Sequence, residues 1–382
     1  MLRFGMTSRR IWKIAKAGSI DRLRLVENDE LPPPGAGEAR VAVRAIGLNF
    51  ADLFALQGLY SATPSGEFTP GLEFSGVIED VGPPPAGGAR HSVLKAGDRV
   101  MGAIRFGAYA ERLNADTRYL RLIPEAWDFA EGAALPAQGL TAYYALRELG
   151  NLKPGQLVLI HSVAGGVGLL ALEMVRKMDA LAIGTIGTPE KISFLRESAG
   201  MDAATILVRD PRRFDEQLAD ALQAVDRPGF DLVLDAVAGE YFQPAFDRLR
   251  AAGRLILFGS ATMMSHASRP NYFTLAWRYL RRPRLDPIEM ISANKSCMAF
   301  NLIWLWDRIE ELTRLYDEML ALDLSPPHVG RRFAFEDAHQ ALRYFQSGKS
   351  VGKVVLEIGD SDASRGRTAT APDSRIVEDG AE

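Results

Sequence analysis

The spacing of hydrophobic and polar residues changes along the chain. In the first third, short stretches alternate between apolar and polar positions, as in residues 38–46 and 71–81, and proline and glycine interrupt them at 32–35 and 82–85. Alternation with a period of two is typical of strands with one buried face, and such interruptions are typical of turns. We therefore expect an antiparallel β-barrel over about residues 11–123.

The pattern changes after about residue 140, where apolar runs that suit buried strands alternate with stretches that suit helices. Strands that alternate with helices of about 10 to 15 residues indicate βαβ units and a doubly wound parallel sheet. The predicted strands cover residues 157–160, 181–186, 204–208, 230–234 and 254–258, and the predicted helices begin at Val167, Pro189 and Glu240.

Residues 336–359 return to the short-strand texture of the first region. The simplest architecture is an α/β protein in which a Rossmann-type parallel sheet is inserted into the antiparallel barrel. We predict the first part of the barrel domain at 11–138, the Rossmann domain at 139–292 and the return to the barrel at 293–359. Residues 360–382 have almost no large apolar side chain to offset the entropy of ordering, so we expect a loose tail there.

Composition excludes several classes of protein. Among the 382 residues, 45 basic and 48 acidic side chains leave a formal charge of −3, and no long block of like charge predicts a nucleic-acid partner. No signal peptide and no membrane-spanning run of about 18 to 20 apolar residues is apparent, so a cytoplasmic protein is expected. The single cysteine, Cys297, allows no internal disulfide and no thiolate-rich metal site, and the five histidines show no ligand spacing.

A glycine turn carries the sharpest local signal. The apolar strand at 157–160 enters this turn, and an amphipathic helix follows at 169–178, which is the context of a dinucleotide-binding fingerprint. Val163 replaces the usual first glycine, and the alternative is a plain tight turn. We predict that free N–H groups at the helix N-terminus bind the cofactor pyrophosphate. The residues involved are Ala164, Gly165, Gly166, Val167 and Gly168.

The end of the second parallel strand indicates which cofactor binds. NAD-binding proteins usually place an acidic residue there, against the ribose hydroxyls. Here no acidic residue stands at the strand end, and Thr188 and Lys191 follow it, so we predict NADPH with these two residues near the 2′-phosphate. Arg209, after the third strand, is a second candidate. The alternatives are that Thr188 only caps a helix and that Lys191 is a solvated lysine; Glu190 argues against a phosphate site.

Several motifs in a fixed order resemble those of the zinc-independent medium-chain dehydrogenases/reductases. The resemblance extends over about residues 11–358 and implies a GroES-like barrel domain with an inserted Rossmann domain. Within this group, residues 47–60 and 293–300 are most similar to the vesicle amine transport proteins, somewhat more than to quinone oxidoreductases. The motifs lie at residues 47–53, 58–60, 70–76, 95–100 and 351–355.

The same resemblance implies a reaction without zinc. Zinc alcohol dehydrogenases carry a cysteine where Asn49 stands and Gly-His-Glu where Gly71, Leu72 and Glu73 stand, so both metal ligands are missing here. Without a Lewis acid, alcohol oxidation is disfavoured. Reduction by NADPH of a quinone or an α,β-unsaturated carbonyl fits better, because these acceptors are already electrophilic.

By resemblance, Asn49 and Tyr60 line the substrate side of the cleft and hydrogen-bond a quinone or enolate oxygen, and Tyr60 is also a candidate proton donor. The alternatives are that Asn49 caps a short helix at 50–56 and that Tyr60 only packs. For Asp52 we favour a structural role over general acid catalysis. Quinone reductases often have a further tyrosine at the position of Phe54.

Five further residues are predicted to contact the cofactor. Thr141 resembles the family's threonine near the nicotinamide, and Phe258, Gly259 and Ser260 follow a parallel strand at its carboxyl end, where such sheets bind ligands. Phe300 matches a segment that closes over the nicotinamide. Lys353 matches another such segment and is a sixth candidate, although it could equally be a surface lysine.

One segment and two broader questions remain open. Residues 271–283 combine aromatic and arginine side chains, so this helix either contacts a membrane surface or lines the substrate cleft or a subunit contact. The resemblance implies a homodimer. The alternative to a reductase is a nucleotide-binding, non-catalytic protein whose cleft takes a lipid or a protein partner.

Overall fold

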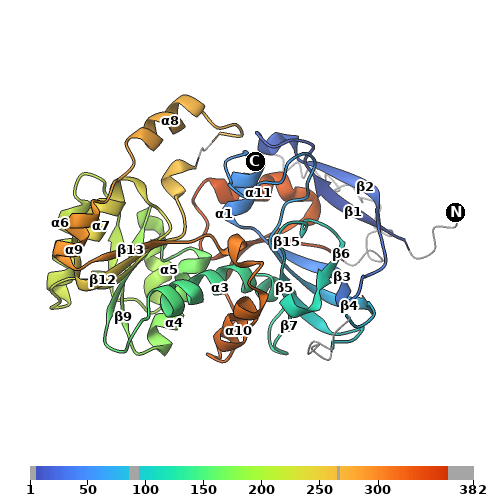
Figure 1. Ribbon diagram of the computed structural model, residues 1–382, viewed down its shortest axis with the longest axis horizontal. Helices are drawn as coiled ribbons and strands as arrows, with labels where there is room; N and C mark the ends of the chain where they lie inside the picture. The colour runs from blue at the N-terminus through green and yellow to red at the C-terminus, as the bar shows by residue number, and fades with distance from the viewer. Residues whose placement is uncertain (1–5, 86–93, 265–266, 360–382) are drawn as a thin grey trace, which may run out of the picture.

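The computed structural model describes residues 6–85, 94–264 and 267–359, so the predicted tail at 360–382 lies outside the described residues. The chain forms two lobes, one built on a mostly antiparallel sheet and one on a parallel sheet (Figure 1). This arrangement confirms the predicted α/β class. None of the helices in the described ranges is long and apolar enough to span a membrane.

The first lobe has a seven-stranded sheet in the order β14-β15-β3-β4-β5-β7, with β6 pairing against β3, and a separate pair β1-β2. All pairs in it are antiparallel except β14 with β15. The strands are β1 (Thr7–Lys13), β2 (Arg24–Leu31), β3 (Glu38–Gly47), β4 (Glu73–Val81), β5 (Arg99–Ala103), β6 (Arg112–Asp116), β7 (Leu120–Leu122), β14 (Val329–Ala334) and β15 (Lys353–Glu357).

The second lobe has six parallel strands in the order β10-β9-β8-β11-β12-β13. The chain order reverses between β8 and β11, and ligands of doubly wound sheets bind at the carboxyl ends of the strands that flank such a reversal. The strands are β8 (Leu157–His161), β9 (Leu181–Ile186), β10 (Ile206–Val208), β11 (Phe230–Asp235), β12 (Leu249–Leu257) and β13 (Ser296–Ala299).

Helices cover both sheets and join the lobes (Figure 1). Helix α4 follows β8 and buries Leu170, Ala171, Met174 and Val175, which lie on one helical face. The helices are α1 (Phe50–Leu56), α2 (Phe129–Gly132), α3 (Pro136–Tyr143), α4 (Gly166–Lys177), α5 (Ile192–Glu197), α6 (Phe214–Ala224), α7 (Phe242–Asp247), α8 (Tyr272–Leu280), α9 (Pro287–Ala293), α10 (Ile309–Leu320) and α11 (Ala338–Gln346).

Two predicted features are wrong. Strand β13 pairs with β12, so the chain is still in the parallel sheet after residue 293, where we placed the return to the barrel domain. The region 336–359 is not made of short strands alone, because α11 precedes β15 in it. Helix α11 buries Ala338, Ala341, Leu342 and Phe345, a spacing of three, four and seven residues that is typical of a helix.

Candidate active site

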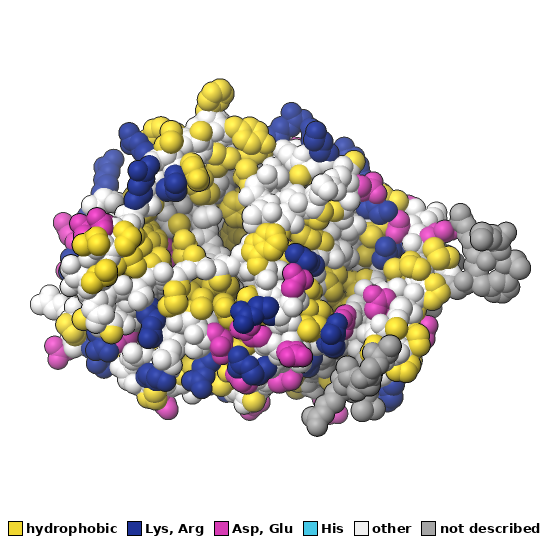
Figure 2. All heavy atoms as spheres, in the orientation of Figure 1, with side chains coloured by type: hydrophobic (Ala, Val, Ile, Leu, Met, Phe, Trp, Pro, Cys, Tyr) yellow, Lys and Arg dark blue, Asp and Glu magenta, His cyan; other side chains and the backbone are white. Residues whose placement is uncertain are grey.

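A cleft of about 900 Å³ lies between the two lobes. Figure 2 shows the hollow between them, with hydrophobic side chains inside it. Barrel-lobe residues around α1 form one wall, and the carboxyl ends of the parallel strands form the other. The predicted site residues that line it are Asn49, Tyr60, Thr141, Ala164, Gly165, Gly166, Val167, Gly168, Thr188, Lys191, Arg209, Phe258, Gly259, Ser260 and Phe300.

The glycine turn joins β8 to α4 with little room for side chains. Gly165 is the N-cap of α4, and a Cβ there would approach only Ser162 O, at 3.2 Å. A Cβ on Gly168 would lie 2.6 Å from Val163 Cα, so only a glycine lets the start of α4 lie this close to the turn. The turn is tied to the other lobe, because Gly352 N donates to Ala164 O at 2.8 Å.

Gln138 is a cleft residue that the sequence analysis did not single out as a site residue. Its side chain fills the space next to Gly166, where a Cβ would overlap the amide oxygen. The residue is 7% exposed, and its Oε1 has no hydrogen-bond partner among the described residues. The glycine at 166 is therefore needed for Gln138 as well as for any bound phosphate.

Two positively charged side chains, Lys191 and Arg209, lie at the end of the cleft next to strands β9 and β10. Lys191 Nζ donates to Gly348 O at 2.7 Å and to Ser350 O at 2.8 Å, so Lys191 is not the freely solvated lysine of the alternative interpretation. Arg209 donates to Thr185 Oγ1 at 2.8 Å and is partly buried. Burial and the charge of nearby Arg209 lower the pKa of Lys191.

Neither Lys191 nor Arg209 forms an ion pair within the described parts of the chain. Glu190, which argued against a phosphate site, is exposed and does not line the cleft. Thr188 occupies the N-cap position before Pro189, as the alternative interpretation predicts, and it also lines the cleft. Two positive charges without a carboxylate partner favour an anion at this end.

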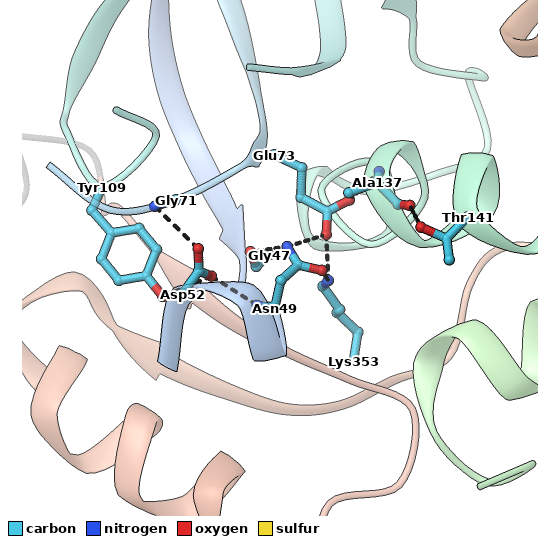
Figure 3. Close-up of polar contacts among 9 residues, drawn as sticks. All are labelled: Gly47, Asn49, Asp52, Gly71, Glu73, Tyr109, Ala137, Thr141 and Lys353. Carbon is cyan, nitrogen blue, oxygen red and sulfur yellow. Dashed lines mark hydrogen bonds and ion pairs between the residues drawn. The ribbon is translucent and has the colours of Figure 1, made fainter. Parts of the chain in front are cut away.

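At the other end, Asn49 belongs to a buried polar cluster (Figure 3). Asn49 Nδ2 donates to Gly47 O at 3.2 Å and to Glu73 Oε1 at 2.8 Å, and Asn49 Oδ1 accepts from Lys353 Nζ at 3.0 Å. Asn49 is the N-cap of α1, as the alternative interpretation predicts. Both amide hydrogens are engaged, so the predicted hydrogen bond from Asn49 to a substrate oxygen has no free donor.

Lys353 is neither a surface lysine nor a residue that lines this cleft. It is 1% exposed and forms an ion pair with Glu73, whose other carboxylate oxygen accepts from Ala137 N at 2.8 Å. Burial lowers the pKa of Lys353, and Glu73 opposes this shift. Gly47 makes room for the pair, because a Cβ there would lie 2.6 Å from Lys353 Cε.

Asp52 has the structural role that we favoured. Its carboxylate accepts from Asn49 N at 2.8 Å and from Gly71 N at 3.2 Å, and Tyr109 OH lies 3.4 Å away (Figure 3). Burial raises the pKa of Asp52 to about 7. The side chain is fully buried and does not line the cleft.

Tyr60 reaches across the cleft to a residue that the sequence analysis missed. Tyr60 OH donates to Asn301 Oδ1 at 2.8 Å, and burial raises the pKa of Tyr60 to about 12. The tyrosine therefore does more than pack. Asn301 directly follows the predicted cleft residue Phe300, but its sequence gives no sign that it faces Tyr60.

Helix α8 does not line the cleft, so the interpretation of segment 271–283 as a cleft wall is wrong. Its side chains are mostly exposed, and the helix lies at the rim of the molecule (Figure 1). His161 lines the cleft and is buried, with Nδ1 3.1 Å from Thr185 Oγ1. Burial lowers the pKa of His161 to about 4, so the ring is neutral at physiological pH.

Comparison with known proteins places this architecture in a family. Residues 35–142 match the alcohol dehydrogenase GroES-like domain, and residues 207–356 match a family described as zinc-binding dehydrogenase. No group of three or more His, Cys, Asp or Glu side chains in the described ranges is arranged to hold a metal ion. The synaptic vesicle membrane protein VAT-1 homolog of Rattus norvegicus is 32% identical over 90% of this chain and 82% of its own length.

Solved structures agree. A human VAT-1 homolog-like protein is 25% identical with a TM-score of 0.74, over 93% of this chain and 99% of the other. A mycobacterial protein complexed with NADPH is 28% identical with a TM-score of 0.76, over 92% and 100%. A quinone oxidoreductase of Pseudomonas syringae pv. Tomato is 26% identical with a TM-score of 0.72, over 92% and 100%.

Proposed function

Because this chain belongs to the medium-chain dehydrogenase/reductase superfamily, in the subgroup of VAT-1 homologs and quinone oxidoreductases, we propose that it is a zinc-free reductase. In this proposal it uses NADPH to reduce a quinone or an α,β-unsaturated carbonyl. The observation that carries the proposal is the division of one cleft into an anion-binding end and an apolar end.

The anion-binding end suits the cofactor. Gly166, Val167 and Gly168 offer backbone N–H groups at the start of α4 to the pyrophosphate, and Lys191 and Arg209 supply positive charge for a 2′-phosphate. Thr188 lies beside them. When bound, NADPH supplies the hydride.

The opposite end suits a flat, electrophilic acceptor. Side chains of the barrel lobe and of the segment after β13 enclose it with apolar surface, which excludes water from the acceptor. Thr141 and Phe300 lie between the two ends, where the nicotinamide would be held, with Phe258, Gly259 and Ser260 on the sheet side. The apolar residues of this end are Phe50, Phe54, Leu72, Ile104, Leu302, Ile303 and Trp306.

The proposal is tested by steady-state oxidation of NADPH and NADH with a panel of quinones and enones. We expect Lys191→Glu to raise the KM for NADPH at least about tenfold and to change the KM for NADH little, because the lost contact serves the 2′-phosphate. Lys153→Glu is the matched control. This exposed lysine lies just before β8, at the amino end of the parallel strands and so away from the cleft at their carboxyl ends. Turnover that prefers NADH would overturn the cofactor assignment.

A second candidate function is supported by α8. This helix exposes aromatic side chains next to arginines, which suits a lipid surface and a role as a nucleotide-binding, non-catalytic protein. Binding of NADPH without turnover of any acceptor would favour this candidate. Absence of NADPH binding would contradict both.

A further inference from the structure

We propose that Asn301 is the catalytic residue that donates a hydrogen bond to the oxygen of the acceptor, and that Tyr60 is the positioning residue that fixes the Asn301 amide. This inference rests on the proposed reductase function and names the group that would stabilise its anionic product. Neither residue of this pair was predicted in this role from the sequence.

The Asn301 amide is held in one orientation. Asn301 is the N-cap of the short helix Leu302–Leu305, and its Oδ1 accepts from Ile303 N at 3.4 Å. Tyr60 OH donates to the same oxygen at 2.8 Å. Because two donors converge on Oδ1, the NH2 group must lie on the other side of the amide.

That NH2 group is available to a ligand. Asn301 lines the cleft and is only partly buried, and its Nδ2 has no hydrogen-bond partner in the described parts of the chain. It comes directly after Phe300, so it lies at the end of the cleft where the acceptor would meet the nicotinamide. An amide N–H fixed in an apolar chamber is a strong hydrogen-bond donor to a developing negative charge.

The hydrogens of Asn49, Tyr60 and Thr141, three other polar residues that line the cleft, are already engaged. Both hydrogens of Asn49 Nδ2 are engaged by Gly47 O and Glu73 Oε1. The Tyr60 proton is engaged by Asn301, and the Thr141 hydroxyl donates to Ala137 O at 2.7 Å. Ser61 is exposed at the rim of the cleft.

The chemistry requires such a donor. As NADPH becomes NADP⁺, the acceptor gains a hydride at carbon, a C–H bond forms, and the π electrons of the acceptor move to its oxygen. The resulting enolate then takes a proton from water, and with a quinone acceptor the hydroquinone forms when the carbon that received the hydride loses a proton to water. Asn301 Nδ2 would stabilise the negative charge on that oxygen before protonation, and removal of one such donor typically costs about 10²–10³ in kcat.

The test uses the full chain with 1,4-naphthoquinone and compares Asn301→Asp, Asn301→Ala, Tyr60→Phe and Asn49→Ala. Asn301→Asp keeps the acceptor for Tyr60 but has no N–H, so we expect kcat to fall about 100-fold. The Kd for NADPH should stay within about twofold of the wild type. Tyr60→Phe should lower kcat about tenfold, because one of the two anchors of the amide is lost.

A pH profile separates catalysis from a merely structural role. In Asn301→Asp the new carboxyl becomes a hydrogen-bond donor when it is protonated, so kcat should recover as the pH is lowered, whereas Asn301→Ala should show no recovery. Equal activity of wild type and both Asn301 variants, or a larger loss in Asn49→Ala, would overturn the assignment. A wild-type protein that binds NADPH but reduces no acceptor would instead refute the proposed function, and the role of Asn301 with it.

Discussion

The buried carboxyl group of Asp52 has a strongly shifted pKa. Burial raises its pKa to about 7, while Lys353 acts against this shift and Glu73 adds to it. Tyr109 and two backbone N–H groups complete its surroundings. The folded state therefore favours the protonated form of Asp52 over a pH range in which the unfolded chain is ionised.

This pKa shift predicts how stability depends on pH. A carboxyl whose pKa is raised on folding stabilises the protein fully below its ordinary pKa of 3.8, and this contribution is lost as the pH rises through about 7. His161, with a pKa lowered to about 4, has the opposite effect, because its contribution is lost as the pH falls. In the wild type the two trends oppose each other between about pH 4 and 7.

Asp52→Asn should remove the part of the pH dependence that comes from Asp52. We expect the free energy of unfolding of this variant, measured in urea, to rise from pH 4 to 7 relative to the wild type by a few kcal/mol, since a pKa unit corresponds to about 1.4 kcal/mol. Asp220→Asn, at an exposed position on α6, is the control and should follow the wild type. Parallel curves for Asp52→Asn and the wild type would show that Asp52 does not titrate in this range.

Single residues of the site differ in how far the sequence predicts them. The glycine turn is local, because a strand, a turn and a helix stand in consecutive residues, and its residues all line the cleft. The partners of Asn49 are not local: Lys353 lies 304 residues away in the chain. The partners of Asn49 come from β3, β4 and β15, which meet only when the barrel sheet forms. The pairing of Tyr60 with Asn301 depends on how the two lobes meet, so no local pattern predicts either arrangement.

Among the elements, α8 stands out because its apolar face is uncovered. Phe273, Trp277 and Leu280, spaced by four and three residues, lie on one face and are 91%, 55% and 69% exposed. Leu275 lies on the opposite face and is partly buried, so the apolar face points away from the molecule. Arg281 and Arg282 stack on aromatic rings beside it. In Figure 1 the helix stands at the upper edge, clear of both sheets.

This geometry predicts reversible binding to anionic lipid. The protein should sediment with vesicles that contain phosphatidylserine, less with phosphatidylcholine alone, and less at high salt. Replacement of Phe273, Trp277 and Leu280 by serine should weaken binding at least about tenfold, because each buried side chain contributes about 1.5–3 kcal/mol. Trp304→Ser is the matched control, since Trp304 is 51% exposed outside α8. Equal binding of both variants would refute a lipid-contact role for α8.

The element pattern was predicted best where strands and helices alternate. Strand β9 begins and ends where predicted, and β8 and β11 extend one residue further. The spacing of the buried apolar residues of α11 does indicate a helix, although we expected short strands there. Strand β13 was missed because four residues at a sheet edge carry little periodic signal.

At the scale of the whole molecule, the cleft lies between two lobes with separate hydrophobic clusters, one of which also includes Met101 and Ile123 of the barrel lobe. The predicted order of barrel, parallel sheet and barrel accounts for this, since a chain that leaves the barrel and returns to it places the inserted sheet beside the barrel. The cleft itself was predictable only as the edge where the parallel strands end. Its depth and its division into two chemical ends follow from packing between the lobes.

The last strand of the parallel sheet leads to a prediction about assembly. Within the described residues, β13 pairs only with β12, so its outer edge is open to another strand. Helix α9, directly before it, exposes Ile288 and Ile291, which are 68% and 74% exposed. A second copy that pairs at this edge would extend the sheet and cover the apolar side chains of α9, and a symmetric dimer is the commonest closed assembly. We therefore predict that sedimentation gives a homodimer.

Ile288→Glu with Ile291→Glu should shift the homodimer to a monomer that keeps its circular dichroism spectrum, because two carboxylates would be buried at the interface. Leu181→Glu is the control, since Leu181 is an exposed apolar residue at the start of the interior strand β9. A dimer that persists in the double variant would place the contact elsewhere, and a wild-type monomer would show that the open edge of β13 is left to solvent. Either result can be read without any assumption about the acceptor, so the assembly is testable before the reaction is known.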